Sequence, residues 1–214
     1  ALVIPEQREN FVKSIEKSVR ESSEWKYEGM LQKPTGEKIW FSGNSNPSPR
    51  ENEIVFNGIV RDITERKKSE MTLAEHEEKI RLLLDSTAEA IYGLDINGNC
   101  TFCNNSCLRL LGYKHSNELL GKNMHWQIHA KHPDGTPFPV EECRIFKAFK
   151  EGEGVHVDDE VLWRSDGTSF AAEYWSYPQR QGGVVVGAVV TFMNITERKR
   201  SEKEIVNLSK FPEE

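Results

Sequence analysis

The sequence predicts an α+β fold in which a five-stranded antiparallel sheet carries helices on one face. Runs of alternating apolar and polar residues indicate strands, and turn dipeptides such as Asn97-Gly98 separate them. One motif also occurs twice, as Ile63-Thr64-Glu65-Arg66 and as Ile195-Thr196-Glu197-Arg198. Each copy follows an apolar run and opens a charged segment that favours a helix. The repetition therefore indicates a tandem duplication of one structural unit.

The composition restricts the class of protein. A net charge of −6 over 214 residues argues against a nucleic-acid partner, because phosphate contacts need clustered Lys and Arg. No apolar run approaches the roughly 20 residues that span a bilayer, and no signal peptide is visible. We therefore expect a cytoplasmic protein without direct membrane contact. In that compartment the four cysteines are expected to be thiols or ligands, not disulfides.

The first unit, residues 1–66, is predicted to hold one helix and three strands. The helix covers residues 5–22, and the strands cover residues 25–32, 37–42 and 54–63. Residues 44–52, with two prolines, are predicted to be a polar connection. Three strands alone would expose the apolar face that carries Ile39, Phe41 and Phe56, so this face is expected to need a cover.

Residues 67–85 are predicted to be a linker helix. The helix is expected to start before the linker, at residue 64, with Thr64 as its N-cap. The segment 64–84 is rich in Glu, Lys, Leu and Ala and has no Pro or Gly, which favours one continuous helix. Leu73, Ile80 and Leu84 form an apolar stripe along it. Such a stripe indicates a partner helix and a short, imperfect coiled coil.

The second unit, residues 86–197, contains the elements of a complete domain. Strands are predicted at residues 90–96, 100–103, 155–164, 168–178 and 183–195. A short helix that Asn104 or Asn105 can cap is predicted to carry residues 107–111 and to stop at Gly112. A second helix is predicted at residues 139–150, with a turn-rich stretch at 116–138 between the two. Residues 198–214 are predicted to be a C-terminal signalling helix, which starts at Thr196, and a tail.

This order of elements, with its turns and its ending, resembles a PAS sensor domain. The motifs that carry the resemblance are Asn97-Gly98, Gly112-Tyr113, Asp166-Gly167 and the terminal Asn194-Ile195-Thr196-Glu197-Arg198. Residues 1–66 resemble only the last helix and the last three strands of such a domain. The resemblance implies a sensory module that acts on an effector outside this chain, such as a histidine kinase or a cyclic-dinucleotide enzyme. It fixes no ligand or cofactor, and no catalytic constellation is visible in the chain.

Six apolar residues could line a pocket for a small molecule between sheet and helices, or simply form the core. These residues are Phe102, Ile145, Phe146, Phe149, Tyr174 and Phe192. On the strand 168–178, Tyr174 is predicted to face the core, and Trp175 and Tyr177 to face away from it. Aromatic side chains on an outer sheet face usually meet a flanking helix or a partner subunit. We therefore expect a homodimer that uses this face and the flanking helices.

Seven residues are candidate ligands of a metal, haem or iron–sulfur cofactor in a redox or cofactor-binding sensor. They are Cys100, Cys103, Cys107, Cys143, His125, His129 and His156. Strand alternation places Cys100 and Cys103 on opposite faces, which favours buried apolar cysteines over a cluster site. His125 and His129 lie in the turn-rich stretch, where solvated histidines are common. The acidic run Asp158-Asp159-Glu160 is predicted to be a solvated strand start.

Overall fold

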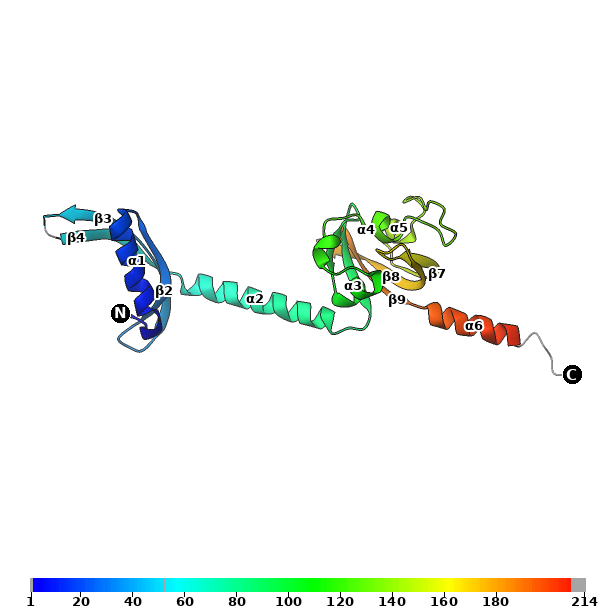
Figure 1. The fold of residues 1–214 in the computed structure, drawn as a ribbon, viewed down its shortest axis with the longest axis horizontal. Coiled ribbons are helices and arrows are strands. Elements are labelled where there is room, and N and C mark those ends of the chain that lie inside the picture. The colour runs from blue at the N-terminus through cyan, green and yellow to red at the C-terminus, as the bar shows by residue number, and fades with distance from the viewer. Residues whose placement is uncertain (1, 52, 209–214) are drawn as a thin grey trace. The chain divides into compact units, whose positions relative to one another are not determined.

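The computed structural model describes residues 2–51 and 53–208, and Figure 1 shows the elements in chain order. Contacts divide the chain into two compact units, with the division inside α2 between Glu78 and Lys79. Asn52 and the predicted tail at residues 209–214 lie outside the described residues. Within the described part of the chain, no helix is long and apolar enough to cross a membrane.

The first unit is an antiparallel four-stranded sheet with one helix. Its elements are β1 (Leu2–Val3), the 3-10 helix η1 (Pro5–Gln7), α1 (Arg8–Glu21), β2 (Trp25–Gln32), β3 (Lys38–Arg50) and β4 (Glu53–Asp62), with strand order β1-β2-β3-β4. The predicted helix and three strands are confirmed, and β1 adds a short edge strand. Gln7 also bonds to β2 at this edge, because its side-chain oxygen accepts a hydrogen bond of 2.7 Å from the Met30 amide.

The helix α1 covers the aromatic face of this sheet. Phe11 packs edge-on against Trp25 and Tyr27, with ring centroids 5.7 and 5.2 Å apart, and lies 6.4 Å from Phe41. Trp25 and Phe41 are buried as a result. The cover that the face around Phe41 was expected to need is therefore present within the unit. The chain's own N-terminal helix supplies it.

The predicted polar connection at residues 44–52 is also wrong, because β3 continues to Arg50 and pairs with β4 up to Glu53. The pairing of β3 with β2 ends at Ser45, so Pro47 and Pro49 lie where β3 has a neighbour on one side only. A proline has no N–H to donate and is tolerated on such an unpaired side. The two prolines therefore led to the wrong prediction of a connection, where the sheet has a long extension made of β3 and β4 alone.

The linker helix α2 (Thr64–Asp85) is continuous, as predicted, and none of its residues is buried. Leu73 and Ile80 are 60% and 59% exposed, whereas Leu84 is half-buried. Met71, Leu82 and Leu83 are exposed as well. An amphipathic helix normally gains its stability by burying an apolar face, and α2 buries none within the chain.

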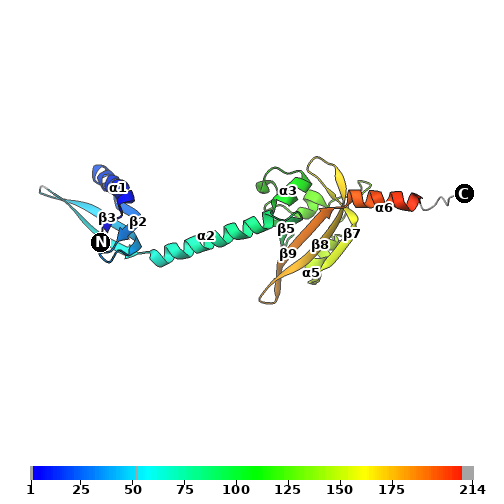
Figure 2. The same ribbon diagram turned by 90° about the horizontal axis from the view of Figure 1, so that it is seen from below.

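The second unit is the predicted five-stranded antiparallel sheet. Its strands are β5 (Ala90–Asp95), β6 (Cys100–Cys103), β7 (Val155–Trp163), β8 (Ser169–Gln181) and β9 (Val184–Asn194), in the order β6-β5-β9-β8-β7. The other elements are α3 (Asn105–Leu111), the 3-10 helix η2 (Ser116–Glu118), α4 (Met124–Ile128), α5 (Arg144–Glu151) and α6 (Thr196–Leu208). Figure 2 shows the twisted sheet with α3 and α5 against it.

One core joins the helices to one face of this sheet. Leu111 from α3, Ile128 from α4 and Phe149 from α5 are buried with Tyr92 and Phe192 from the strands. The predicted end of α3 at Gly112 is confirmed, with φ of 76°, and of the two candidate caps it is Asn104 whose side chain accepts from Cys107 N. A positive φ favours glycine, which has no Cβ to clash.

The helix predicted at residues 139–150 begins five residues later, at Arg144. Residues 139–143 form turns instead, in which the amide of Glu142 donates to Pro139 O and that of Cys143 to Val140 O. Cys143 is therefore the extended N-cap residue of α5 and not part of the helix. The stretch 116–138 is turn-rich as expected, and it also holds η2 and the one-turn helix α4.

Candidate functional site

A small cavity lies between the sheet and the helices of the second unit. Its volume is about 20 Å³, which is room for roughly one water molecule. Tyr92 and Leu94 from β5 form one wall, and Ile145, Phe146 and Phe149 of α5 form another. The three α5 residues were predicted pocket candidates. The polar side chains of Asn123, His125, His129 and Cys143 complete the lining.

The other three pocket candidates do not line this cavity. Tyr174 and Phe192 are fully buried and belong to the core. Phe102 lies on the opposite side of the sheet, because its ring covers Gly93, where a Cβ would sit 2.3 Å from Phe102 Cε1. Phe102 pairs with Gly93, whose neighbours Tyr92 and Leu94 face the core. Its assignment to the pocket was therefore wrong.

The structure brings three of the seven candidate ligands together, namely His125, His129 and Cys143. One ligand atom from each residue lies within 4.8 Å of the other two, and all three residues are buried. Nδ1 of His129 lies 3.4 Å from Sγ of Cys143. His125 belongs to α4, His129 is its C-cap, and Cys143 precedes α5. The turn before α5 thus aims the thiol at α4.

Each of the two imidazoles meets an oxygen with the ring nitrogen that points away from this group. Nε2 of His125 lies 2.9 Å from the carbonyl oxygen of Phe138, in a hydrogen bond. Nε2 of His129 lies 2.9 Å from Oε2 of Glu160, although this contact does not have hydrogen-bond geometry. Nδ1 of His125 is buried and has no hydrogen-bond partner.

The electrostatics of the group favour a thiolate beside an imidazolium. Burial alone would raise the pKa of Cys143, but its contacts with His125 and His129 lower that pKa to about 6. Burial alone would lower the pKa of His129, yet Cys143 and Glu160 together raise it to about 9. At neutral pH the pair is therefore charged, and the thiolate is the form that binds metals.

Cys100, Cys103 and Cys107 form a separate group of thiols. The strand-alternation argument that separated Cys100 from Cys103 was wrong, because β6 carries a bulge opposite Gly93 and Leu94. The extra residue places Cys100 opposite Leu94 and Cys103 opposite Tyr92, which are on one face. Hydrogen bonds from Cys100 and Cys107 lower the pKa of Cys103, and the pKa values of its two neighbours are raised.

His156 is not part of either group. Its ring stacks on Trp175, with centroids 4.6 Å apart, and its Nε2 lies 2.8 Å from Oε1 of Glu173. Glu173 and Trp175 belong to the outer sheet face, as the alternation of β8 predicted, and Tyr177 on that face is 60% exposed. The histidine is thus a surface neighbour of the predicted association face.

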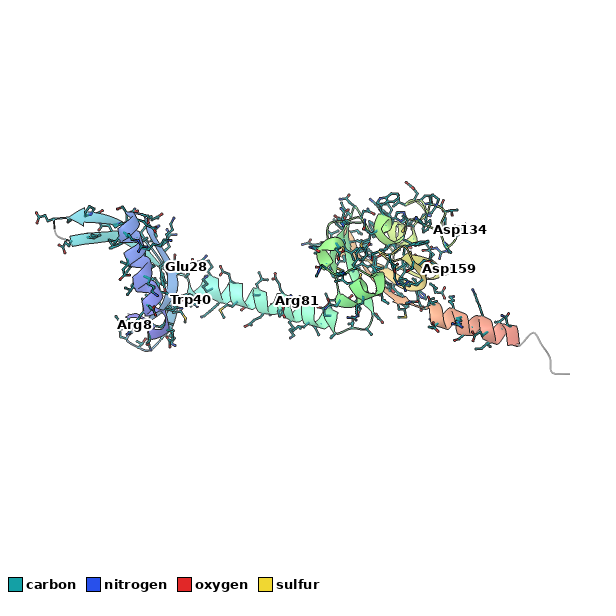
Figure 3. The ribbon with its side chains drawn as sticks, viewed as in Figure 1. Arg8, Glu28, Trp40, Arg81, Asp134 and Asp159 are labelled. Atoms are coloured by element: carbon teal, nitrogen blue, oxygen red, sulfur yellow. The ribbon has the colours of Figure 1, made fainter. Side chains whose placement is uncertain are left out.

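Glu160 is the site residue that sequence reasoning missed. A bulge in β7 separates the pairs Val157–Tyr174 and Glu160–Ala172, so both β7 residues face the core. The Glu160 carboxylate accepts a hydrogen bond of 2.6 Å from the Tyr174 hydroxyl and lies 3.2 Å from Nε of Arg144. These contacts and His129 hold the pKa of Glu160 below its ordinary value, although burial opposes the change. Asp159, labelled in Figure 3, is solvated as predicted.

The duplicated motif forms the same junction at the end of both sheets. In the first unit the Ile63 amide donates to Trp40 O at 2.9 Å, and the Trp40 amide donates to Thr64 Oγ1 at 3.0 Å. In the second unit the Ile195 amide donates to Ala171 O at 2.9 Å, and the Ala171 amide donates to Thr196 Oγ1 at 3.2 Å. Each helix therefore starts while hydrogen-bonded to the neighbouring strand. Thr64 is the first helical residue, not the predicted N-cap.

Arginines of the motif add a charged contact between helix and sheet. Arg198 of α6 donates a hydrogen bond of 2.7 Å to Oε2 of Glu173 on β8. Arg66 and Lys67 of α2 both pair with Glu28 on β2. Figure 3 labels Glu28 and Trp40 where the sheet meets the start of α2. Both helices are thus fixed to their own sheets by a carboxylate as well as by the backbone.

The comparisons with known proteins agree with this architecture. The family model of the PAS domain matches residues 2–65 and 88–197, which together are most of the chain. The chain belongs to the PAS domain family. Both halves of the match end at the duplicated junction, so the sequence resemblance is confirmed for the complete second PAS domain and for the partial first one.

The chain is also similar to a curated relative and to two solved structures. The "Probable diguanylate cyclase DgcE" of Escherichia coli K12 is 25% identical over 205 residues, covering 95% of this chain and 18% of that protein. The chain thus spans less than a fifth of that relative's length. An RNA-binding light-oxygen-voltage receptor is 12% identical, with a TM-score of 0.48 over 98% of this chain and 88% of that one. The PAS domain of an HTR-like protein from Haloarcula marismortui is 21% identical, with a TM-score of 0.48 over 60% and 99%.

Proposed function

We propose that this chain is a cytoplasmic sensory and dimerisation module that relays the state of its second PAS domain through helices to an effector outside the chain. The observation that carries the proposal is the duplicated junction. At both copies, the first residues of a helix exchange hydrogen bonds with the strand beside the one that leads into it. A shift of the sheet then moves the start of the helix with it.

The second junction is also connected to the core of its domain, through the strand β8. Ala171, which bonds Thr196 and Ile195, lies on β8 between the buried residues Phe170 and Ala172. Ile195 itself is only 4% exposed. Because close-packed cores have low compressibility and transmit strain, a change at the cavity is expected to reach α6 through β8.

Dimerisation accounts for the exposed apolar surfaces. Leu73 and Ile80 are one heptad apart on α2, and their exposed fractions are 60% and 59%. The outer face of β8 adds Tyr177 and the half-buried Trp175. A symmetric pair would bury like patches against like. Trp175→Glu is therefore expected to weaken association if the outer sheet face contributes to the contact.

The effector is proposed to be an enzyme of the histidine-kinase or cyclic-dinucleotide class. This proposal rests on the relative that is named as a probable diguanylate cyclase, of which the chain matches 18% of the length. In this proposal the chain itself has no catalytic activity and biases the equilibrium of the attached enzyme. The partners are a second copy of the chain and that effector domain.

The relay is tested in the protein that joins this chain to its effector. Thr196→Val removes the hydroxyl that accepts from the Ala171 amide but keeps a β-branched side chain. We expect altered effector output together with faster amide exchange at Ala171 and over the first turn of α6. Ser201→Ala, an exposed change on the same helix, is the control. Faster exchange with unchanged output would refute the relay.

A further inference from the structure

We propose that His125, His129 and Cys143 form a binding site for a single divalent cation of the zinc class. The proposal does not depend on the relay, because binding of an ion is measured directly. Within the described residues, this is the group in which three His, Cys or acidic ligand atoms come within 4.8 Å of one another. All three side chains are at least nine-tenths buried, at 7%, 2% and 2% exposure.

The separation of the donor atoms suits a tetrahedral ion. With bonds of about 2.3 Å to sulfur and about 2.0–2.1 Å to nitrogen, tetrahedral geometry places the two donors about 3.6 Å apart. Nδ1 of His129 and Sγ of Cys143 are already 3.4 Å apart. No two ligand atoms of the group are more than 4.8 Å apart, so small side-chain rotations would bring all three to tetrahedral positions around one ion.

The outer contacts orient both imidazoles for metal binding. Metal-binding histidines usually direct the other ring nitrogen to a carbonyl or carboxylate, which fixes the tautomer. Here Nε2 of His125 meets the Phe138 carbonyl, and Nε2 of His129 lies beside the Glu160 carboxylate. An ion that binds here displaces the proton between His129 and Cys143, and the Nδ1 lone pairs of both imidazoles then face it. Nδ1 of His125, buried without a hydrogen-bond partner, is a polar atom for which an ion would be the missing partner.

The carboxylate of Glu160 is itself held in place. The Tyr174 hydroxyl donates to its Oε2 at 2.6 Å, and Arg144 lies against its Oε1. This arrangement assigns Glu160 and Tyr174 as positioning residues that act through His129. The donor set of two nitrogens and one thiolate excludes Mg²⁺ and Ca²⁺ as preferred ions, because those prefer oxygen ligands.

Space and access fit one ion and one exchangeable ligand. The cavity that His125, His129 and Cys143 line is about 20 Å³, so a water can take a fourth position but a haem or flavin cannot enter without rearrangement. His129 and Glu160 also line a surface cleft of about 420 Å³ together with Lys131, His132 and Arg144. His129 thus lies between this cleft and the small cavity, since it lines both.

Zinc binding is tested with the purified chain. After chelation and dialysis, the chain is titrated with Zn²⁺, and with Co²⁺ as a spectroscopic probe. We expect one ion per chain, a thiolate-to-cobalt charge-transfer band, and a rise in the thermal midpoint on adding Zn²⁺. Zinc should also protect Cys143 from alkylation, read by peptide mass spectrometry, while leaving Cys103 reactive. This protection needs no variant, so it applies even if a substitution unfolds the chain.

Variants separate the three side chains from other thiols and histidines. Cys143→Ser and His129→Ala are each expected to abolish the cobalt band, whereas Cys103→Ser and His132→Ala should leave it unchanged. Glu160→Gln is expected to weaken affinity about 10–100-fold with the band retained, as for an outer contact. Absence of Zn²⁺ binding, alkylation of Cys143 unchanged by zinc, or a band that depends on Cys103 would each overturn the proposal.

Discussion

The side-chain amide of Asn104 donates a hydrogen bond of 2.9 Å to the carbonyl oxygen of Leu84, in the last turn of α2. The same amide also donates to Glu89 O, and its oxygen accepts from the amides of Ile91 and Cys107. One buried side chain thus joins the end of α2, the strand β5 and the cap of α3. These hydrogen bonds connect the core of the second domain to the end of α2.

Asn104→Ala is expected to lower the free energy of unfolding of the second domain by about 3 kcal/mol, because it removes a helix cap and leaves buried backbone groups without partners. Urea denaturation followed by circular dichroism measures this. Asn105→Ala is the matched control, since the side chain of Asn105 is exposed and its amide keeps Asp85 as acceptor. Equal losses in the two variants would contradict the assignment.

Acid is expected to loosen the start of α6 through Glu173. Contacts with His156 and Arg198 lower the pKa of Glu173 from its ordinary value of 4.5, against the opposing effect of burial. A lowered pKa in the folded state means that the carboxylate stabilises the fold above the unfolded pKa, and that this contribution is lost as pH falls through the folded pKa. The loss therefore begins below about pH 4.5.

Thermal unfolding of the wild type and of Glu173→Gln across that range measures the effect. The variant is expected to unfold at a lower temperature near pH 7, and the difference should disappear in acid, where both side chains are neutral. Glu197→Gln, which makes the same change at an exposed position in the first turn of α6, is the control. A difference that stays constant at every pH would show that Glu173 acts through packing and not through its charge.

The regular parts of the fold were predictable because periodicity and turn chemistry act locally. The Asn97-Gly98 turn and the helix end at Gly112 lie where the sequence places them, and the cap of α3 is one of the two adjacent asparagines that the sequence offers. Alternation along β8 also put Tyr174 inside and Tyr177 outside. Each of these features depends on residues within a few positions of one another, which a single sequence displays.

The candidate site was less predictable because two bulges decide which side chains reach it. The extra residue in β6 brings Cys103 to the face of Cys100, and the extra residue in β7 turns Glu160 inward. Neither bulge has a sequence signal of its own, since the local hydropathy fits a regular strand equally well. The approach of Cys143 to His129 in turn depends on where α5 begins. These are properties of the assembled sheet and helices.

Tyr174→Phe is expected to lower the free energy of unfolding by about 1–3 kcal/mol, because the Glu160 carboxylate loses the hydroxyl that donates to it at 2.6 Å. The ring itself remains and no cavity forms. Tyr177→Phe provides the same chemical change at a residue that is 60% exposed, and its effect should stay within about 0.5 kcal/mol. Chemical denaturation of both variants decides, and a similar cost at the two positions would count against a structural role for the Tyr174–Glu160 contact.

The dimer proposed above is expected to depend on the apolar stripe of α2. Leu73→Glu puts a charge at a position that is 60% exposed in the single chain, so it should leave the fold unchanged and weaken association by burying an unpaired carboxylate. Thr72→Glu adds the same charge to the neighbouring position and serves as the control. Sedimentation velocity at micromolar concentration separates a dimer from a single species of 24.6 kDa. The wild type and Thr72→Glu should be dimers and Leu73→Glu a monomer; a monomeric wild type would eliminate the dimer, and a dimeric Leu73→Glu would move the contact to another surface.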